Sequence, residues 1–278
     1  MIPFRKPTKT SPKDSTLPLR KQGSLGAVRP AAKWITTLLW ITAFGTFIWG
    51  GIVDAIKDRV DGVWADNALH RGSWIDFGFD TYALHEASYV VYFNSIAISL
   101  AIQLISTFSL HCTELLVNAT RDEKTRRRAA NLKGKGAMIS RGAIKEACTS
   151  WETISLFIIK TAVHWAFGES PSVSFSAQGT SEFLMWPNAL FVLGAMMIVA
   201  AVFSTFLCYR RYSGPQPAAY GHLQTIVNFI DEWGPDGRPL YWGDKGPVAW
   251  GAGWEVRHAG TAGEASAVAP IRMDARYT

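Results

Sequence analysis

Three long runs of uncharged, mostly apolar residues divide the chain, and each is long enough to cross a membrane. They extend over residues 34–53, 88–110 and 183–209. A helix rises about 1.5 Å per residue, so about 20 apolar residues are needed to cross a hydrocarbon layer of about 30 Å. Pro187 suits the start of the third helix, since the first turn tolerates proline. We therefore predict transmembrane helices near residues 34–53, 88–112 and 188–209.

A fourth apolar segment, near residues 151–168, is harder to interpret. Its apolar core, Thr153 to Gly168, is only sixteen residues long and is interrupted by Lys160 and His164. Hydropathy alone leaves three alternatives open: a span, a re-entrant segment, or a helix that lies in the membrane interface.

The distribution of charge favours the span. Residues 1–33 carry eight basic residues and one acidic residue, and residues 119–147 carry nine and three. Residues 54–87 carry three basic and seven acidic residues, whereas residues 169–187 contain no Lys or Arg. Cytoplasmic loops are enriched in Lys and Arg. Four spans with both termini cytoplasmic satisfy every loop, so we predict an all-α membrane protein whose four-helix transmembrane bundle occupies residues 34–212.

Composition agrees with a membrane protein. Charged residues make up 18% of the 278 residues, below the roughly 25% of soluble domains. The net charge of +6 is concentrated in two segments, which is typical of membrane topology, and we expect no nucleic-acid partner. The basic residues 1–33 contain four prolines between Pro3 and Pro18, which favours a disordered cytoplasmic tail over a mitochondrial transit helix. A plasma-membrane or endomembrane location is therefore preferred to a mitochondrial one.

The composition changes after the last span. A Pro- and Gly-containing breaker at 213–217 precedes a predicted helix at 218–233, and residues 234–263 are rich in Gly and Trp and predict turns with short strands. We interpret residues 213–278 as a cytoplasmic docking segment. Its docking face on the bundle or the membrane surface is formed by apolar residues at helical spacing: Leu223, Ile226, Val227, Ile230 and Trp233.

A dense cluster of basic residues follows the second span, and we predict that it lies at the cytoplasmic lipid surface. Its members are Arg121, Lys124, Arg126, Arg127 and Arg128. Such juxtamembrane clusters attract anionic lipids by about 1 kcal/mol per residue. The simpler alternative is that the cluster only sets the topology.

The intramembrane polar candidates are Lys160, His164, Asn94 and Gln103. Lys160 and His164 are four residues apart and share one helical face. An ionisable residue within a span usually faces the bundle interior and has a partner. Glu152 is about 12 Å of helical rise away from Lys160, and Glu114 is within reach only if the second helix is deeply set. The alternative is a Lys160 side chain that extends to the interface.

Sequence motifs offer little support for catalysis. The chain has no P-loop, G-x-S-x-G, H-E-x-x-H or G-x-G-x-x-G motif. His111, Cys112 and Glu114 do not have the spacing of a zinc site, so we expect no metal and no cofactor. We favour a structural or interaction protein, a scaffold or adaptor, with a membrane-protein partner or a homo-oligomer. The alternatives are a small-solute transporter or channel-like oligomer that uses Lys160 and His164, and a membrane-embedded enzyme.

Several stretches resemble a group of fungal multi-pass integral membrane proteins with no assigned activity. They are LHCTELLVNATRDE (110–123), SWETISLFIIKTAVHWAFG (150–168), YGHLQTIVNFIDEW (220–233), LYWGDKG (240–246) and RHAGTAG (257–263). Together they cover about a quarter of the chain. The resemblance implies a eukaryotic membrane protein whose cytoplasmic tail belongs to the same unit as the spans, and it implies no catalytic residues.

Overall fold

The chain divides into two compact units in the computed structural model. The structure describes residues 16–56, 75–76, 87–138, 148, 150–175, 181–232, 238–248 and 255–278. The tail unit contains Met1–Pro30, Asn118–Ser150 and Tyr209–Thr278, and the helical unit contains Ala31–Val117 and Trp151–Cys208. One long helix contributes to both units. Each unit is described by itself below.

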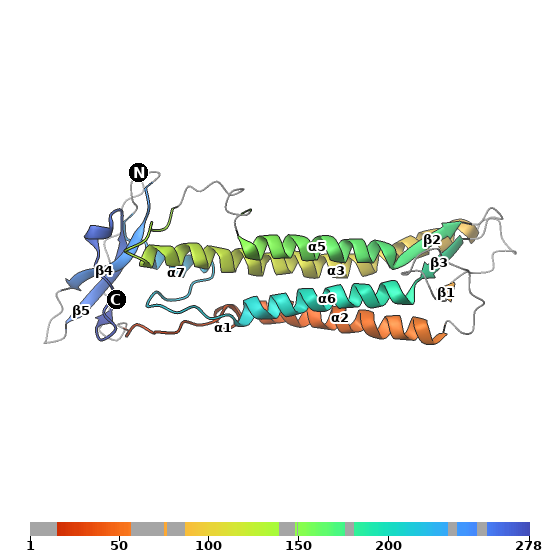
Figure 1. The fold of residues 1–278 in the computed structure, drawn as a ribbon, viewed down its shortest axis with the longest axis horizontal. Helices are drawn as coiled ribbons and strands as arrows, with labels where there is room; N and C mark the ends of the chain where they lie inside the picture. Colours follow the sequence, from red (N-terminus) through yellow and green to blue (C-terminus); the bar gives the residue numbers. More distant parts are fainter. Residues whose placement is uncertain are drawn as a thin grey trace. The chain divides into compact units, whose positions relative to one another are not determined.

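Long helices dominate the helical unit and run side by side (Figure 1). They are α2 (Ala31–Ile56), α3 (Ala87–Arg127), α5 (Trp151–Glu169) and α6 (Pro187–Tyr209). Within the described residues, three segments are long and apolar enough to cross a membrane: Ala31–Ala55, Ser99–Ala130 and Pro187–Tyr209. The prediction of a mostly helical protein with three helices long and apolar enough to span a membrane is confirmed.

One hydrophobic cluster draws on all four long helices of the helical unit. Its buried members are Leu39 and Ala43 of α2, Leu110 of α3, Val163, Ala166 and Phe167 of α5, and Leu193, Met197, Ala200 and Ala201 of α6. The opposite faces of the same helices expose large apolar side chains, such as Ile48, Leu104 and Phe157, each at least 65% exposed. A helix that is apolar on every side is typical of a membrane span.

Small residues and hydroxyl groups bring the helices close together. Gly194 of α6 lies so near Phe47 of α2 that an added Cβ would be 2.6 Å from the ring. The indole N–H of Trp40 donates a hydrogen bond to Thr205 across α2 and α6 at 3.0 Å. Such contacts hold helices together where the surrounding lipid is itself apolar.

A small sheet in the helical unit corrects the all-helical prediction. Its strands are β1 (Ile75–Asp76), β2 (Pro171–Phe175) and β3 (Ser181–Met185), in the order β1-β3-β2. Both neighbours of β3 are antiparallel to it, and Ile75 pairs with Met185. The short strands lie between long apolar runs, so hydropathy did not reveal them.

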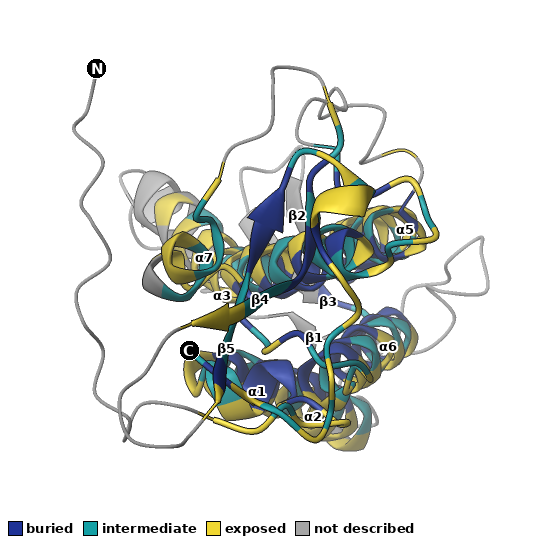
Figure 2. Cartoon of the chain, turned by 90° about the vertical axis from the view of Figure 1, so that its left-hand side faces the viewer, coloured by how far each residue is buried: buried dark blue, intermediate teal, exposed yellow. Residues whose placement is uncertain are grey.

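The tail unit combines short helices with a second sheet. It contains α1 (Leu25–Val28), the end of α3, the 3-10 turn η3 (Arg128–Ala130), α7 (Leu223–Phe229), β4 (Tyr241–Val248), β5 (Val256–Ala262), the turn η4 (Ala265–Ala267) and β6 (Arg276–Tyr277). The strand order is β4-β5-β6, with β4 antiparallel and β6 parallel to β5. Figure 2 shows β4 passing from a buried stretch to an exposed end and β5 ending buried.

Backbone pairing joins the three segments of the tail unit and, from residue 16 onward, corrects the prediction of a disordered tail at 1–33. Thr16 pairs with Tyr277, Lys21 with Ser213, and Ala137 with Leu240. The buried Gln22 side chain also donates to the Gly214 carbonyl at 2.9 Å. Residues 16–30 are therefore ordered by partners more than 190 positions away, which local composition does not reveal. Residues 1–15 lie outside the described part of the chain.

Two predicted helix boundaries were also wrong. The second span continues as a single helix, α3, to Arg127, so the basic cluster is helical up to Arg127 and Arg128 begins a 3-10 turn. The predicted helix at 218–233 is limited to α7, Leu223–Phe229, with His222 as its N-cap. The preceding residues instead form a turn at Tyr220 and Gly221, both with positive φ.

Candidate functional site

The side chain of Glu123, near the end of α3, connects several residues of the tail unit. This carboxylate is completely buried and contacts both Arg126 and Arg127 at 2.8 Å. It also accepts hydrogen bonds from the backbone N–H groups of Ala219 and Tyr220, at 3.1 and 3.0 Å. The spacing of three and four residues places both arginines over Glu123 on one helix face. A buried carboxylate with this many donors is well compensated.

Aromatic rings complete the arginine sites. The Arg126 guanidinium lies 5.0 Å from the ring centre of Phe229, and the Arg127 guanidinium lies 5.1 Å from that of Tyr212. Arg126 also donates to the Pro217 carbonyl at 2.5 Å. These are cation–π contacts, and they connect α3 to both the 212–217 segment and α7.

Tyr220 adopts a strained backbone conformation next to Glu123. Its φ is 42°, in the left-handed region that costs a non-glycine residue about 1–3 kcal/mol. The hydrogen bond from its N–H to Glu123 and the burial of its ring offset this cost. Burial, and then the nearby Glu123 carboxylate, raise the pKa of Tyr220 to about 12.

This cluster changes the interpretation of the basic residues. The side chains of Arg126 and Arg127 are only 16% and 11% exposed, because they compensate Glu123. Arg121 lies 3.7 Å from Asp122, Lys124 is half-buried, and Arg128 is exposed. Two of the five predicted lipid-surface residues are therefore internal counter-charges.

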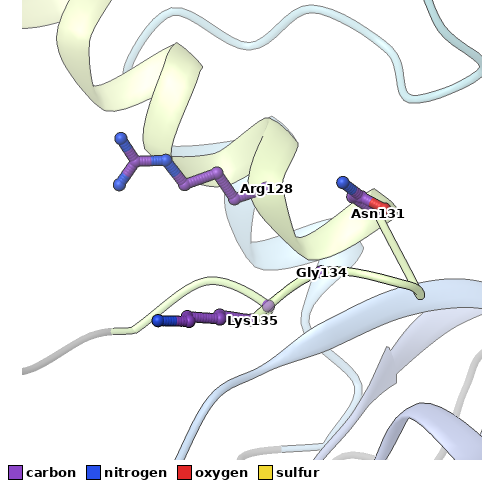
Figure 3. A pocket seen from close by; sticks show the side chains of 5 residues that line it. Arg128, Asn131, Gly134 and Lys135 are labelled. Carbon is purple, nitrogen blue, oxygen red and sulfur yellow. The ribbon is translucent and has the colours of Figure 1, made fainter.

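A pocket of about 200 Å³ lies beside Arg128, at the turn formed by residues 131–136. In Figure 3 the side chains of Arg128 and Lys135 extend toward the same side of this turn, and Asn131 lies at its other end. The N–H of Gly134 donates to the Asn131 carbonyl at 2.9 Å and closes the turn. Arg128, Lys133 and Lys135 are all exposed, so the cationic surface extends beyond the predicted cluster.

Lys160 has a carboxylate partner in the helical unit. Its Nζ lies 3.0 Å from Glu114 Oε2, and His111 Nδ1 lies 3.4 Å from the same Nζ. The Lys160 side chain is 21% exposed, whereas the side chains of Glu114 and His111 are 49% and 60% exposed. The pair therefore joins α3 to α5 at the surface of the helical unit. The sequence indicated Glu114 as a partner of Lys160 only if the second helix was set deep in the membrane. In the structure α3 extends to Arg127, so Glu114 lies inside this helix and reaches Lys160.

The other intramembrane candidates do not join this pair. His164 is exposed on α5, and Gln103 is half-buried on α3. The Asn94 side chain lies outside the described part of the structure. Of the intramembrane polar candidates whose side chains the structure describes, only Lys160 forms an ion pair between helices.

Asp231 forms a second, half-buried charge cluster in the tail unit. Its Oδ2 lies 3.0 Å from both Lys245 Nζ and His258 Nε2, and its Oδ1 accepts from the Thr261 N–H at 2.6 Å. Gly260 leaves room for this carboxylate, since a Cβ there would overlap both of its oxygens. The cluster connects the end of α7 to β4 and β5.

The pKa values of Asp231 and His258 move in opposite directions. Burial tends to raise the pKa of Asp231, but hydrogen bonds from His258, Thr261 and Lys245 outweigh burial and leave it well below its ordinary value. The hydrogen bond to Asp231 raises the pKa of His258, against the opposing effect of burial. Both shifts favour the charged pair.

We predict that this pair makes unfolding pH-dependent. The His258 contribution is complete below its ordinary pKa of 6.5 and is lost as the pH rises through the raised value. The Asp231 contribution is complete above 3.8 and is lost at lower pH. Thermal unfolding of wild type and His258→Gln should therefore differ most between these values. The difference should be about 0.5 kcal/mol, because more than a third of the His258 side chain is exposed. If the Asp231→Asn variant keeps the full pH dependence of unfolding, the pH dependence does not arise from the Asp231–His258 pair.

A third carboxylate, Asp244, holds the tail-unit sheet together. Its Oδ2 lies 2.6 Å from Arg257 Nε and accepts from the Tyr277 hydroxyl at 2.9 Å. Its Oδ1 accepts from the Gly246 N–H at 2.8 Å, at a bulge where Gly246 has a φ of +105°. One side chain thus contacts β4, β5 and β6.

The predicted docking face is divided between two environments. Leu223 and Val227 are 75% and 62% exposed. Ile226 and Ile230 are half-buried and line a cavity of about 330 Å³ within the tail unit. Trp233 lies outside the described residues. Only part of the face is therefore available for an external partner.

Sequence reasoning missed the three carboxylates that organise the tail unit: Glu123, Asp231 and Asp244. One local signal existed for Glu123, an acid three and four residues before two arginines on a helix. The side-chain partners of Asp231 and Asp244 are 13 to 33 positions away, so periodicity could not identify them.

No known family model, curated protein or solved structure matches this chain.

Proposed function

We propose that the chain is a four-span membrane protein with both termini on the cytoplasmic side, and that α5 is the fourth span. The α5 helix has 19 residues. Three of them, Val163, Ala166 and Phe167, belong to the core shared with α2, α3 and α6, and Ile159 packs against this core. Its central Lys160 is compensated by Glu114. Both observations lower the cost of placing this charged helix in a bilayer.

Strand pairing supports the same topology. The segment between α2 and α3 contains β1, and the segment between α5 and α6 contains β3, and these strands pair. Paired strands must lie on one side of a membrane. The N-terminal segment, the 118–150 segment and the C-terminal segment are likewise paired with one another. If α2, α3 and α6 cross the membrane, the two sets lie on opposite sides, and α5, which leads from one set to the other, crosses as well.

Cysteine labelling tests this topology with a residue that the chain already has. Cys148 is exposed, while Cys208 is buried. In sealed vesicles of known orientation, we expect an impermeant maleimide to label Cys148 and an added Ser181→Cys from opposite sides, with Cys148 cytoplasmic. A Cys148→Ser chain serves as the blank. Labelling of both positions from one side would contradict the four-span proposal.

For function, we propose a structural or interaction protein of the membrane. The observation that carries this proposal is that the carboxylates Glu123, Asp231 and Asp244, of which Glu123 and Asp244 are buried, each compensate cations within the tail unit. These charges stabilise a folded unit made of three separate chain segments. A folded unit attached to membrane helices is suited to bind a partner protein, and the Glu114–Lys160 pair serves to hold helices together.

A transporter or channel-like oligomer is the second candidate. His111, Glu114 and Lys160 are partly exposed on the surface of the helical unit, where a second copy of the chain could enclose them. An enzyme that uses Lys160 or His164 has less support, because Lys160 is engaged by Glu114.

Removal of the intramembrane charge distinguishes these functions. If the pair is structural, Lys160→Met should lower protein stability by about 1–3 kcal/mol, since it leaves Glu114 without its lysine. The double variant Lys160→Met with Glu114→Met should recover most of this loss. His164→Phe, which changes an exposed residue of the same helix, serves as the control. Wild-type proteoliposomes should pass no more ions or protons than empty ones. Flux that disappears in Lys160→Met at equal protein level would contradict the structural proposal and favour transport.

We also propose anionic lipid headgroups as a partner of Arg128, Lys133 and Lys135. These cations are exposed near the end of α3, where a juxtamembrane cluster attracts anionic lipid. Acetylation of Lys133 and Lys135 should be about fivefold slower in phosphatidylserine nanodiscs than in phosphatidylcholine nanodiscs, and high salt should remove the difference. Equal rates in both would contradict this proposal.

The resemblance to fungal multi-pass membrane proteins extends the proposal to that group. The five stretches that carry it contain the organising acids Glu114, Glu123, Asp231 and Asp244, together with Lys160. We propose that members of the group share these internal charge clusters. Sequences of the group that replace an acid but keep its basic partners would contradict this extension.

A further inference from the structure

The cavity in the tail unit has a mostly apolar wall. Its volume is about 330 Å³, and its apolar lining includes Ile226 and Phe229 of α7, together with Ile230 and Leu240. This volume is at the lower end of the range of small-molecule sites. The size suits a compact ligand or a short alkyl chain.

Buried polar atoms without partners are concentrated in the same wall. Within the described residues, eight buried side-chain nitrogen or oxygen atoms have no hydrogen-bond partner, and four of them belong to Arg126, Gln216 and Trp242. All three residues line the cavity. Gln216 and Trp242 are only 2% and 3% exposed. A buried polar group left unpaired costs about 1–3 kcal/mol, so such a concentration in one wall indicates a ligand.

Two of these polar residues lie around one aromatic ring. The Arg126 guanidinium lies 5.0 Å from the centre of the Phe229 ring. The Trp242 ring packs edge-on against the same ring, with centroids 6.0 Å apart. Both side chains therefore contact the same residue of α7, Phe229, in the wall of the cavity.

The unpaired atoms define the chemistry of the ligand. Trp242 Nε1 and the Arg126 nitrogens are donors and need an acceptor, whereas Gln216 Oε1 is an acceptor and needs a donor. A hydroxyl group fulfils both requirements. The cavity lining carries two carboxylates, Asp122 and Glu123, and one cation, Arg126, so an anionic head would meet an excess of negative charge, whereas a neutral hydroxyl would not.

We propose that this cavity binds a neutral amphipathic molecule with a hydroxyl head and an aliphatic body. The hydroxyl contacts the region of Arg126, Gln216 and Trp242, and the aliphatic body contacts Ile226, Phe229, Ile230 and Leu240. This site is independent of the four-span topology and of the interaction role proposed above.

Photo-crosslinking of the full chain in detergent tests the proposal. The probe is decan-1-ol with a diazirine in its alkyl chain, and crosslinked residues are mapped by mass spectrometry. We expect crosslinks on the segments that contain Ile226–Ile230 and Ala137–Met138. Unlabelled decan-1-ol should compete with the probe, while decane and decanoate at equal concentration should compete about fivefold less well.

Three variants localise the site. Ile226→Trp fills the cavity and should abolish these crosslinks, whereas Val227→Trp adds the same side chain at an exposed neighbouring position and should leave them unchanged. Trp242→Phe keeps a packed ring but removes the N–H donor, and it should reduce crosslinking about three- to tenfold. Crosslinks unaffected by Ile226→Trp would overturn the cavity assignment. Equal competition by decane or decanoate would overturn the neutral hydroxyl head.

Discussion

Replacement of Glu123 by Gln should destabilise the chain more than any other single removal of charge in the tail unit. The amide keeps the size of the side chain but leaves Arg126 and Arg127 without their buried counter-charge. Breaking a buried ion pair in this way costs about 3–5 kcal/mol. Thermal unfolding of the full chain in detergent, and proteolysis of residues 213–232, measure the loss.

The neighbouring acid provides the control for Glu123→Gln. Asp122 precedes it on the same helix and its side chain is 63% exposed, so Asp122→Asn removes the same charge at little cost. Changing Glu123, Arg126 and Arg127 together to Met should recover much of the stability, because the unpaired charges are then gone. If Glu123→Gln and Asp122→Asn are equally stable, Glu123 does not organise the tail unit.

Replacement of Gly194 by Val should disrupt the contact between α2 and α6. A Cβ at Gly194 would lie 2.6 Å from Cδ2 of Phe47, well inside van der Waals contact. The helices must separate or the ring must move, and overpacking of this kind costs about 1–3 kcal/mol. Close approach at small residues is a main source of helix association in membranes. Thermal unfolding in detergent should show the effect.

Two further chains test whether the Gly194 effect is steric. Gly45 lies on α2 with no heavy atom within 4 Å of an added Cβ, so Gly45→Ala should be neutral or slightly stabilising. Gly194→Val combined with Phe47→Ala should be more stable than expected from the sum of the two single changes. Strictly additive losses would mean that Gly194 and Phe47 do not share this contact.

The basic cluster shows how a local pattern can be recognised and still be misinterpreted. The run from Arg121 to Arg128 was identified correctly as an unusual concentration of charge. Its assignment to the lipid surface treated all five cations as equivalent. Folding brings Ala219 and Tyr220 to Glu123, and that contact buries Arg126 and Arg127 while Arg128 stays exposed.

Sequence alone determined the membrane helices, because each depends on a property of consecutive residues. An apolar run of about 20 residues is long enough to cross a bilayer wherever it occurs in the chain. The same is true of the short strands expected within residues 234–263, where β4 and β5 are found. Lys160 was identified for a similar reason, as a charge within an apolar helix.

Only the tertiary structure decided which residues meet. The backbone donors to Glu123 and the partners of Asp231 come from other parts of the chain, as does Gly214, whose carbonyl accepts a hydrogen bond from Gln22. The β1–β3 pairing likewise joins segments more than 100 residues apart. A buried charge requires partners from any part of the chain. Hydropathy and helical spacing describe only neighbours along the sequence, so they could place the spans but not the polar clusters that connect the segments of each unit.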